Sequence, residues 1–111
     1  MTGNIYQKLA ARTINENLTD DSKLYHALFG MVSEIGEIHS LYQKFYQGHG
    51  RPSDEHVKKE IGDLLWFICE LCTVKHWNLE DIMMLNIEKL TRRYPDGFDV
   101  ERSKHRAAGD I

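Results

Sequence analysis

The chain has few of the features that mark membrane, secreted or nucleic-acid-binding proteins. Its apolar runs are only a few residues long, too short to cross a bilayer, so no membrane partner is expected. The stretch MTGNIYQKLAAR lacks the charged-then-apolar layout of a secretory signal, and with only two cysteines a reducing, cytoplasmic compartment is expected. The net charge of -3 gives no basic field, so no nucleic-acid partner is expected.

The sequence also has only 2 prolines and no strand-like alternation, and helical periodicity dominates its 111 residues. We expect helices over about 4–18, from the cap region 19–22 to residue 45, over 53–76 and over 79–94. Short connections between them predict an all-α fold, a four-helix bundle. Residues 1–94 would form this helical domain, and residues 95–111 a C-terminal tail that packs on the bundle or extends from it.

The predicted inward residues follow spacings of three and four. The first helix offers Ile5, Leu9 and Ile14. The second offers Leu24, Leu28, Met31, Ile35, Ile38, Tyr42 and Phe45, and the third Val57, Ile61, Leu64, Ile68 and Leu71. Each stripe would face the core of the bundle.

Two similar acidic pairs interrupt this apolar pattern. The stretches VSEIGEIHSLYQKF and KKEIGDLLWFICEL each hold two carboxylates three residues apart around an Ile-Gly pair. At about 100° per residue, Glu34 falls just inside one edge of its stripe and Glu37 further out. Glu60 lies between the directions of Leu71 and Phe67, with Asp63 on the rim. Because both helices show the same offset on the same side, the four carboxylates are expected to face one cleft.

Two explanations for the carboxylates compete. A buried carboxylate without a partner costs several kcal/mol, so the cluster needs a counter-charge. Ordinary ion pairs could supply it, from Lys44, Lys58, Lys59 and Lys89. The matched offsets favour a cation instead, and an all-oxygen ligand set favours Mg²⁺, with Mn²⁺ as the alternative. Mg²⁺ commonly completes its shell with water and substrate phosphates, which predicts a phosphate-bearing substrate.

A second possible metal site is weaker. Cys69 and Cys72 form a C-x-x-C inside a predicted helix, with His76 on the same face, but no fourth zinc ligand is evident. Two small, half-buried side chains are the favoured interpretation.

The segments SEIGEI, KKEIGDLLWF and NIEKLTRRYPDGFDVERSKHR together resemble the MazG-like nucleoside triphosphate pyrophosphohydrolases of the all-α NTP pyrophosphatase superfamily. The resemblance covers about residues 24–106. It implies Mg²⁺-dependent hydrolysis of a nucleotide's α–β phosphoanhydride to a nucleoside monophosphate and pyrophosphate. It also implies that the metal ligands and catalytic residues are Glu34, Glu37, Glu60 and Asp63.

The chain departs from the family pattern at Ser33, where many relatives carry another Glu. The number of metal ions and the identity of the general base therefore stay open. The preferred base and sugar, and the choice between canonical and modified nucleotides, depend on pocket shape and stay open as well.

Candidate substrate-binding residues lie outside the acidic motifs. Asn86, Lys89 and Arg93 share one face of the fourth helix, where the alternative is a solvated helix end. Lys44 lies two turns past Glu37, and Arg92, Arg102 and Arg106 are weaker candidates. Trp66, one turn from Asp63, could stack on a base, although an aromatic at helical spacing is more often a core residue. His26 and His39 could be polar residues of the site, although isolated histidines usually are not.

Three functions are compatible with the sequence. The first is a nucleotide pyrophosphohydrolase that sanitises the nucleotide pool, and the second a non-catalytic nucleotide- or partner-binding module of the same fold. The third is a structural bundle with salt-bridged acidic pairs. The helix-interior glycines Gly36 and Gly62 suggest close approach of a partner helix, so we expect a homodimer or homotetramer.

Overall fold

A computed structural model describes residues 1–111 as five helices with no strand. Four of them are long, namely α1 (Gly3–Ala11), α2 (Asp20–Tyr46), α3 (Asp54–Val74) and α4 (Leu79–Arg93). A short helix, α5 (Val100–Lys104), lies in the segment predicted as a tail. The predicted all-α class is confirmed. None of the helices is long and apolar enough to span a membrane.

Each long helix begins at a residue whose side-chain oxygen accepts a hydrogen bond from a backbone N–H of the first turn. These N-cap residues are Thr2, Thr19, Ser53 and Asn78. Acidic residues occupy the first turns of α2, α3 and α4, where they interact favourably with the helix dipole. The predicted starts of these three helices agree with the structure.

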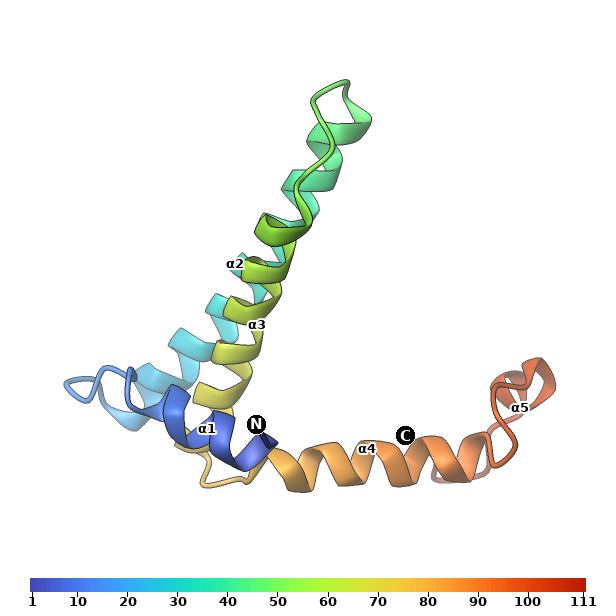
Figure 1. The fold of residues 1–111 in the computed structure, drawn as a ribbon. Coiled ribbons are helices and arrows are strands. Elements are labelled where there is room, and N and C mark those ends of the chain that lie inside the picture. Colours follow the sequence, from blue (N-terminus) through green and yellow to red (C-terminus); the bar gives the residue numbers. More distant parts are fainter.

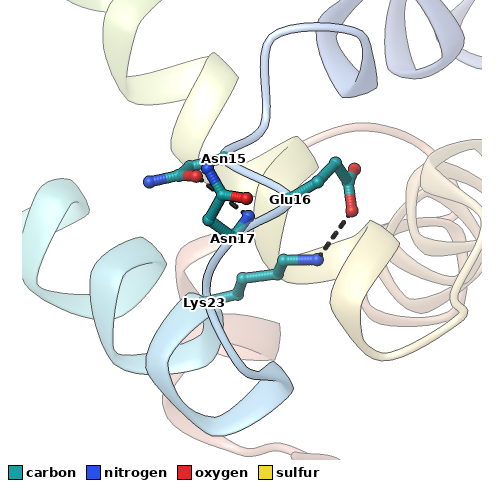
Figure 2. A network of polar contacts seen from close by, with 4 residues as sticks. All are labelled: Asn15, Glu16, Asn17 and Lys23. Carbon is teal, nitrogen blue, oxygen red and sulfur yellow. Dashed lines mark hydrogen bonds and ion pairs between the residues drawn. The ribbon is translucent and has the colours of Figure 1, made fainter.

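The predicted end of the first helix, Leu18, is wrong, because α1 ends at Ala11. The Thr13 hydroxyl donates to the carbonyl of Ala10, and the Asn15 side chain accepts from the Asn17 backbone N–H. Such local side-chain bonds compete with helical ones. The resulting loop is tied to α2 by an ion pair of 3.0 Å between Glu16 and Lys23 (Figure 2).

Helices α2 and α3 lie side by side as an antiparallel hairpin (Figure 1). Gly30 permits their close approach, since a Cβ added there would lie 2.2 Å from Cε1 of Phe67. Nothing lies within 4 Å of a Cβ added at Gly36 or Gly62. Within one chain, therefore, the tight helix crossing is at Gly30, and no helix packs on the two glycines of the acidic motifs.

Helix α1 joins the hairpin to α4. The Gln7 side chain donates to the Trp77 carbonyl at 2.8 Å and accepts from the Leu79 backbone N–H at 2.7 Å. Both the backbone N–H and the side chain of Asn4 donate to the Glu80 carboxylate at 3.0 Å. Beneath this junction lies a small core of Cys69, Cys72 and Leu79. Polar bonds and a few apolar side chains thus fix the base of α4.

The four long helices do not enclose a common core within one chain. Helix α4 extends away from the hairpin (Figure 1), and the radius of gyration is 17.4 Å. A compact domain of this length would have a radius of about 13 Å. Several residues predicted to point inward are consequently exposed to 40% or more, namely Ile5, Leu9, Leu28, Ile35, Tyr42 and Ile61. Their apolar stripes have no covering element in the same chain.

The C-terminal segment turns back along α4 (Figure 1). The Arg93 guanidinium donates to the Asp110 carboxylate at 2.7 Å, and both side chains are largely buried. This ion pair holds the chain end against α4.

Candidate metal centre

Three carboxylates from the α2–α3 hairpin converge on one point. Glu34 on α2 and Glu60 and Asp63 on α3 each offer an oxygen, and these oxygens lie within 4.8 Å of one another. Because α2 and α3 are antiparallel and the acidic motifs sit at the same level, residues 26 positions apart become neighbours. Both motifs lie on the same side of the apolar stripe of their helix, as predicted, and this shared position brings the three carboxylates together.

Glu34 has no partner that would compensate its charge. Its Oε2 is buried without a hydrogen-bond partner. The pKa of Glu34 is raised to about 7, and burial is the largest cause. A hydrogen bond to Glu60 and the negative charges of Asp63, Glu60 and Glu37 raise it further. The hydrogen bond between the two carboxyl groups requires a proton on one of them. At neutral pH the site therefore favours gaining either a proton or a cation.

The lysines proposed as counter-charges do not pair with these carboxylates. Lys59 forms its ion pair with Glu55 at 3.2 Å, one turn away on the solvent side of α3. Lys44 and Lys58 make no ion pair, and Glu60 is contacted by His56 at 3.1 Å. The salt-bridged structural explanation thus lacks its cations in this structure.

The residues fit a hard divalent ion. Three carboxylates, one of them with a buried oxygen that has no hydrogen-bond partner, supply the ligand chemistry that Mg²⁺ or Mn²⁺ prefers. Glu37 is exposed and lies outside the three-residue group, but it is close enough for its charge to raise the pKa of Glu34. It borders the cluster on the solvent side, as its position further from the apolar stripe predicted.

A cavity of about 400 Å³ opens next to the carboxylates. It is lined by Thr13, Glu34, Asp63, Trp66 and Phe67. The Trp66 indole N–H donates to the Thr13 hydroxyl at 2.7 Å, and the Trp66 and Phe67 rings pack edge to face at 5.1 Å. The cavity therefore combines an acidic end with an aromatic wall, and its volume suits a small organic ligand.

Comparison with known protein families agrees with this geometry. The MazG nucleotide pyrophosphohydrolase domain matches residues 25–98, two thirds of the chain. The chain belongs to the MazG nucleotide pyrophosphohydrolase family. No curated protein and no solved structure matches. The matched segment includes both acidic motifs and residues 86–98 of the third segment on which the resemblance rests, while residues 99–106 of that segment lie outside the match.

The basic residues predicted for this MazG-type site lie outside the cavity beside the carboxylates. Lys89 and Arg93 line a separate cavity of about 360 Å³, shared with Arg92, Arg102, His105 and Arg106. Asn86 is exposed on α4, and Lys44 is exposed near the far end of α2. Helix α4 extends away from the hairpin, so one chain does not bring Asn86, Lys89 or Arg93 to the carboxylates (Figure 1). Lys44 is on the hairpin, ten residues past Glu34 on α2.

The cysteines have the structural role that was favoured. Both are buried, more fully than the half-buried state expected. Burial raises the pKa of both thiols, that of Cys69 to about 11, so both are protonated at neutral pH. His76 is exposed, and the two cysteines and His76 do not converge as a set of ligand atoms, in contrast to Glu34, Glu60 and Asp63.

Sequence reasoning missed one buried acidic residue, Glu70. Its side chain is 1% exposed, and it contacts Nδ1 of His26 at 2.6 Å. Glu70 lies seven residues after Asp63, two helical turns along the same face of α3. This spacing could have indicated that its carboxylate lies on the same side of the helix as the acidic motif. Its partner, 44 residues away on α2, was visible only once the pairing of the helices was known.

Proposed function

We propose that the chain is a Mg²⁺-dependent nucleoside triphosphate pyrophosphohydrolase, with Mn²⁺ as a possible substitute. Water would cleave the α–β phosphoanhydride, giving a nucleoside monophosphate and pyrophosphate. The observation that supports this most is the convergence of Glu34, Glu60 and Asp63 around a buried oxygen that lacks any counter-charge. Family membership supports the reaction class.

In this proposal Glu34, Glu60 and Asp63 hold the divalent ion, and Glu37 contributes from the rim. A bound ion would polarise phosphoryl oxygens and lower the pKa of a coordinated water. Whichever carboxylate of the four is not occupied by metal can accept a proton from the attacking water.

The aromatic wall is the proposed base site. Trp66 and Phe67 line the cavity that begins at Glu34 and Asp63, so a nucleotide with its phosphates at the carboxylates can lay its base against these rings. Stacking on aromatic side chains stabilises any base, because every base has a π-face.

The phosphate chain needs cations, and no lysine or arginine lines the cavity beside the carboxylates. Lys44, Asn86, Lys89 and Arg93 remain the proposed contacts, and those on α4 would come from a partner subunit. A homodimer or homotetramer is supported by the open shape of the protomer and by apolar side chains of α4 that are at least half exposed, namely Met83, Met84, Leu85 and Ile87. Covering these side chains would stabilise the assembly by the hydrophobic effect.

The test is a panel of ribo- and deoxyribonucleoside triphosphates, canonical and modified, incubated with Mg²⁺, with Mn²⁺ and with EDTA. We expect monophosphate and pyrophosphate in equal amounts, only with metal. Orthophosphate as the product would reject α–β cleavage. Nucleotide binding without turnover would select the non-catalytic module instead.

A further inference from the structure

His26 and the buried Glu70 form a polar pair that the proposed reaction does not use. Glu70 is the largest fully buried side chain of the protein, and its Oε1 lies 2.6 Å from His26 Nδ1. Its Oε2 is buried without a partner. Burying a carboxylate in this way is costly, so the contact that it makes with His26 calls for a functional explanation.

The imidazole of His26 is held at the edge of the proposed base site. Its ring centroid lies 5.4 Å from that of Phe67 and 6.2 Å from that of Trp66, the two aromatic residues of the cavity wall. The side chain is 47% exposed, and Nε2 makes no hydrogen bond within the chain. Glu70 thus fixes one ring nitrogen and leaves the other free to meet a ligand.

The position along the hairpin suits contact with a base. His26 and Glu34 are eight residues apart on α2, which places them about 12 Å apart along the helix axis. Between them, the Phe67 ring lies over Gly30, where no side chain intervenes. A nucleotide with its phosphates at Glu34 and Asp63 could lay its base on the aromatic wall. Its outer edge, which carries the C4 substituent of a pyrimidine or the C6 substituent of a purine, would then point toward His26.

The protonation of the pair decides what Nε2 can recognise. A net charge on the pair would leave an uncompensated ion in a site where Glu70 is 1% exposed, so a net-neutral pair is favoured. A neutral pair holds two protons. One lies between Oε1 and Nδ1, whichever atom carries it. The other is on Nε2 rather than on Oε2, because a proton on the buried Oε2 would have no acceptor, whereas the imidazole is 47% exposed. Nε2 is then a hydrogen-bond donor.

We infer that His26, oriented by Glu70, reads the outer edge of the base and selects bases that present a carbonyl oxygen there. These are uracil and thymine through O4 and guanine through O6, whereas cytosine and adenine present an amino group. His26 is the specificity-determining residue and Glu70 its positioning residue. This inference rests on the proposed function for the location of the phosphates.

The experiment compares nucleotides that present either a carbonyl or an amino group at this edge, dUTP with dCTP and dGTP with dATP. The first readout is the ratio of kcat/KM within each pair. The second is the ratio of Kd values for the α,β-methylene analogues, which requires no turnover. We expect the wild type to favour the keto member of each pair by about tenfold, the effect of one buried hydrogen bond.

The variant is His26→Phe combined with Glu70→Leu, which removes the donor without leaving a buried charge unpaired. We expect both ratios to fall below about threefold while Mg²⁺-dependent turnover persists. His26→Gln with wild-type Glu70 keeps a donor and should retain part of the preference. His49→Gln, on an exposed loop histidine, is the matched control and should leave the ratios unchanged.

Two results would overturn the inference. One is a wild-type preference for dCTP and dATP, and the other is a pair of ratios that the double variant leaves within twofold of wild type. Absence of hydrolysis for every nucleotide would instead reject the proposed function. The Kd ratios of the analogues would still decide the role of His26 in that case.

Discussion

The α2–α3 hairpin and helix α4 differ sharply in what surrounds their side chains. The hairpin buries polar groups, with Glu70 at 1% exposure and an oxygen of Glu34 cut off from any partner. Helix α4 instead exposes apolar groups, with Leu85 at 64% and Ile87 at 62%. Buried charge and exposed hydrophobic surface are both unfavourable, but they are relieved by different ligands. A cation relieves the first, and a protein surface relieves the second.

The largest expected effect comes from the carboxylates of the hairpin. Asp63→Asn should lower kcat/KM by at least about a hundredfold. Removing a residue that only hydrogen-bonds a metal ligand already lowers activity by up to about a hundredfold, and removing the ligand itself should lower it at least as much. The helical circular dichroism spectrum should stay unchanged. Glu55→Gln is the matched control, since Glu55 lies on the same helix and pairs only with Lys59. Near-normal activity of Asp63→Asn, or of Glu37→Gln, would show that the ligand assignment is wrong.

The exposed face of α4 can be tested separately. Leu85→Glu with Ile87→Glu places two charges on the surface that a partner subunit is proposed to cover. We expect the mass measured by light scattering to fall to that of one 13.0 kDa chain, with activity lost because α4 no longer supplies cations to a neighbour. Glu88→Gln, an exposed neighbour on α4, should keep the assembly. A wild-type protein that is monomeric at all concentrations would contradict the proposed oligomer.

The pKa of Glu34 predicts a pH dependence of metal binding. Since this pKa is about 7, a metal ion must displace a proton below that pH, and affinity for Mn²⁺ should rise about tenfold between pH 6 and pH 8.

A carboxyl whose pKa is raised on folding also stabilises the metal-free fold only at low pH. This contribution is full below the ordinary value of 4.5 and is lost as pH rises through about 7. Calorimetric titration with Mn²⁺ measures the first effect, and urea unfolding in EDTA across the same pH range measures the second. Glu34→Gln should lack the pH-dependent step in both experiments.

A smaller effect is expected at the helix crossing. Gly30→Ala places a methyl group against the Phe67 ring and should destabilise the protein by about 1–3 kcal/mol. Gly36→Ala meets no atom within 4 Å in its own chain and should stabilise by about 0.5–1 kcal/mol. Urea unfolding of the two variants gives the comparison. Destabilisation by Gly36→Ala would instead indicate a partner helix packed at that position.

Local features of the sequence predicted much of the hairpin but little of its surroundings. The acidic motifs gave the juxtaposition of Glu34, Glu60 and Asp63, because helical periodicity fixes which side chains share a face. Periodicity did not reveal that α1 ends at Ala11, where side-chain hydrogen bonds of Thr13 and Asn15 replace helical ones.

Other features depend on contacts between distant segments. The pairing of Glu70 with His26 follows from the register of two helices, and no local pattern encodes it. Periodicity also did not reveal that Ile35 and Ile61 are exposed, because no element of the same chain covers them. Nor did it reveal that Lys89 and Arg93 line a different cavity from the carboxylates. An apolar stripe predicts that a face will be covered, but it does not say by which chain.

The most direct test is a crystal structure of the protein with Mn²⁺, solved with anomalous diffraction data collected at the manganese edge. We predict an anomalous peak bonded to oxygens of Glu34, Glu60 and Asp63, and its loss in Asp63→Asn. A peak at other residues only, or no peak with Mn²⁺ in excess at pH 8, would contradict the proposed role of these carboxylates.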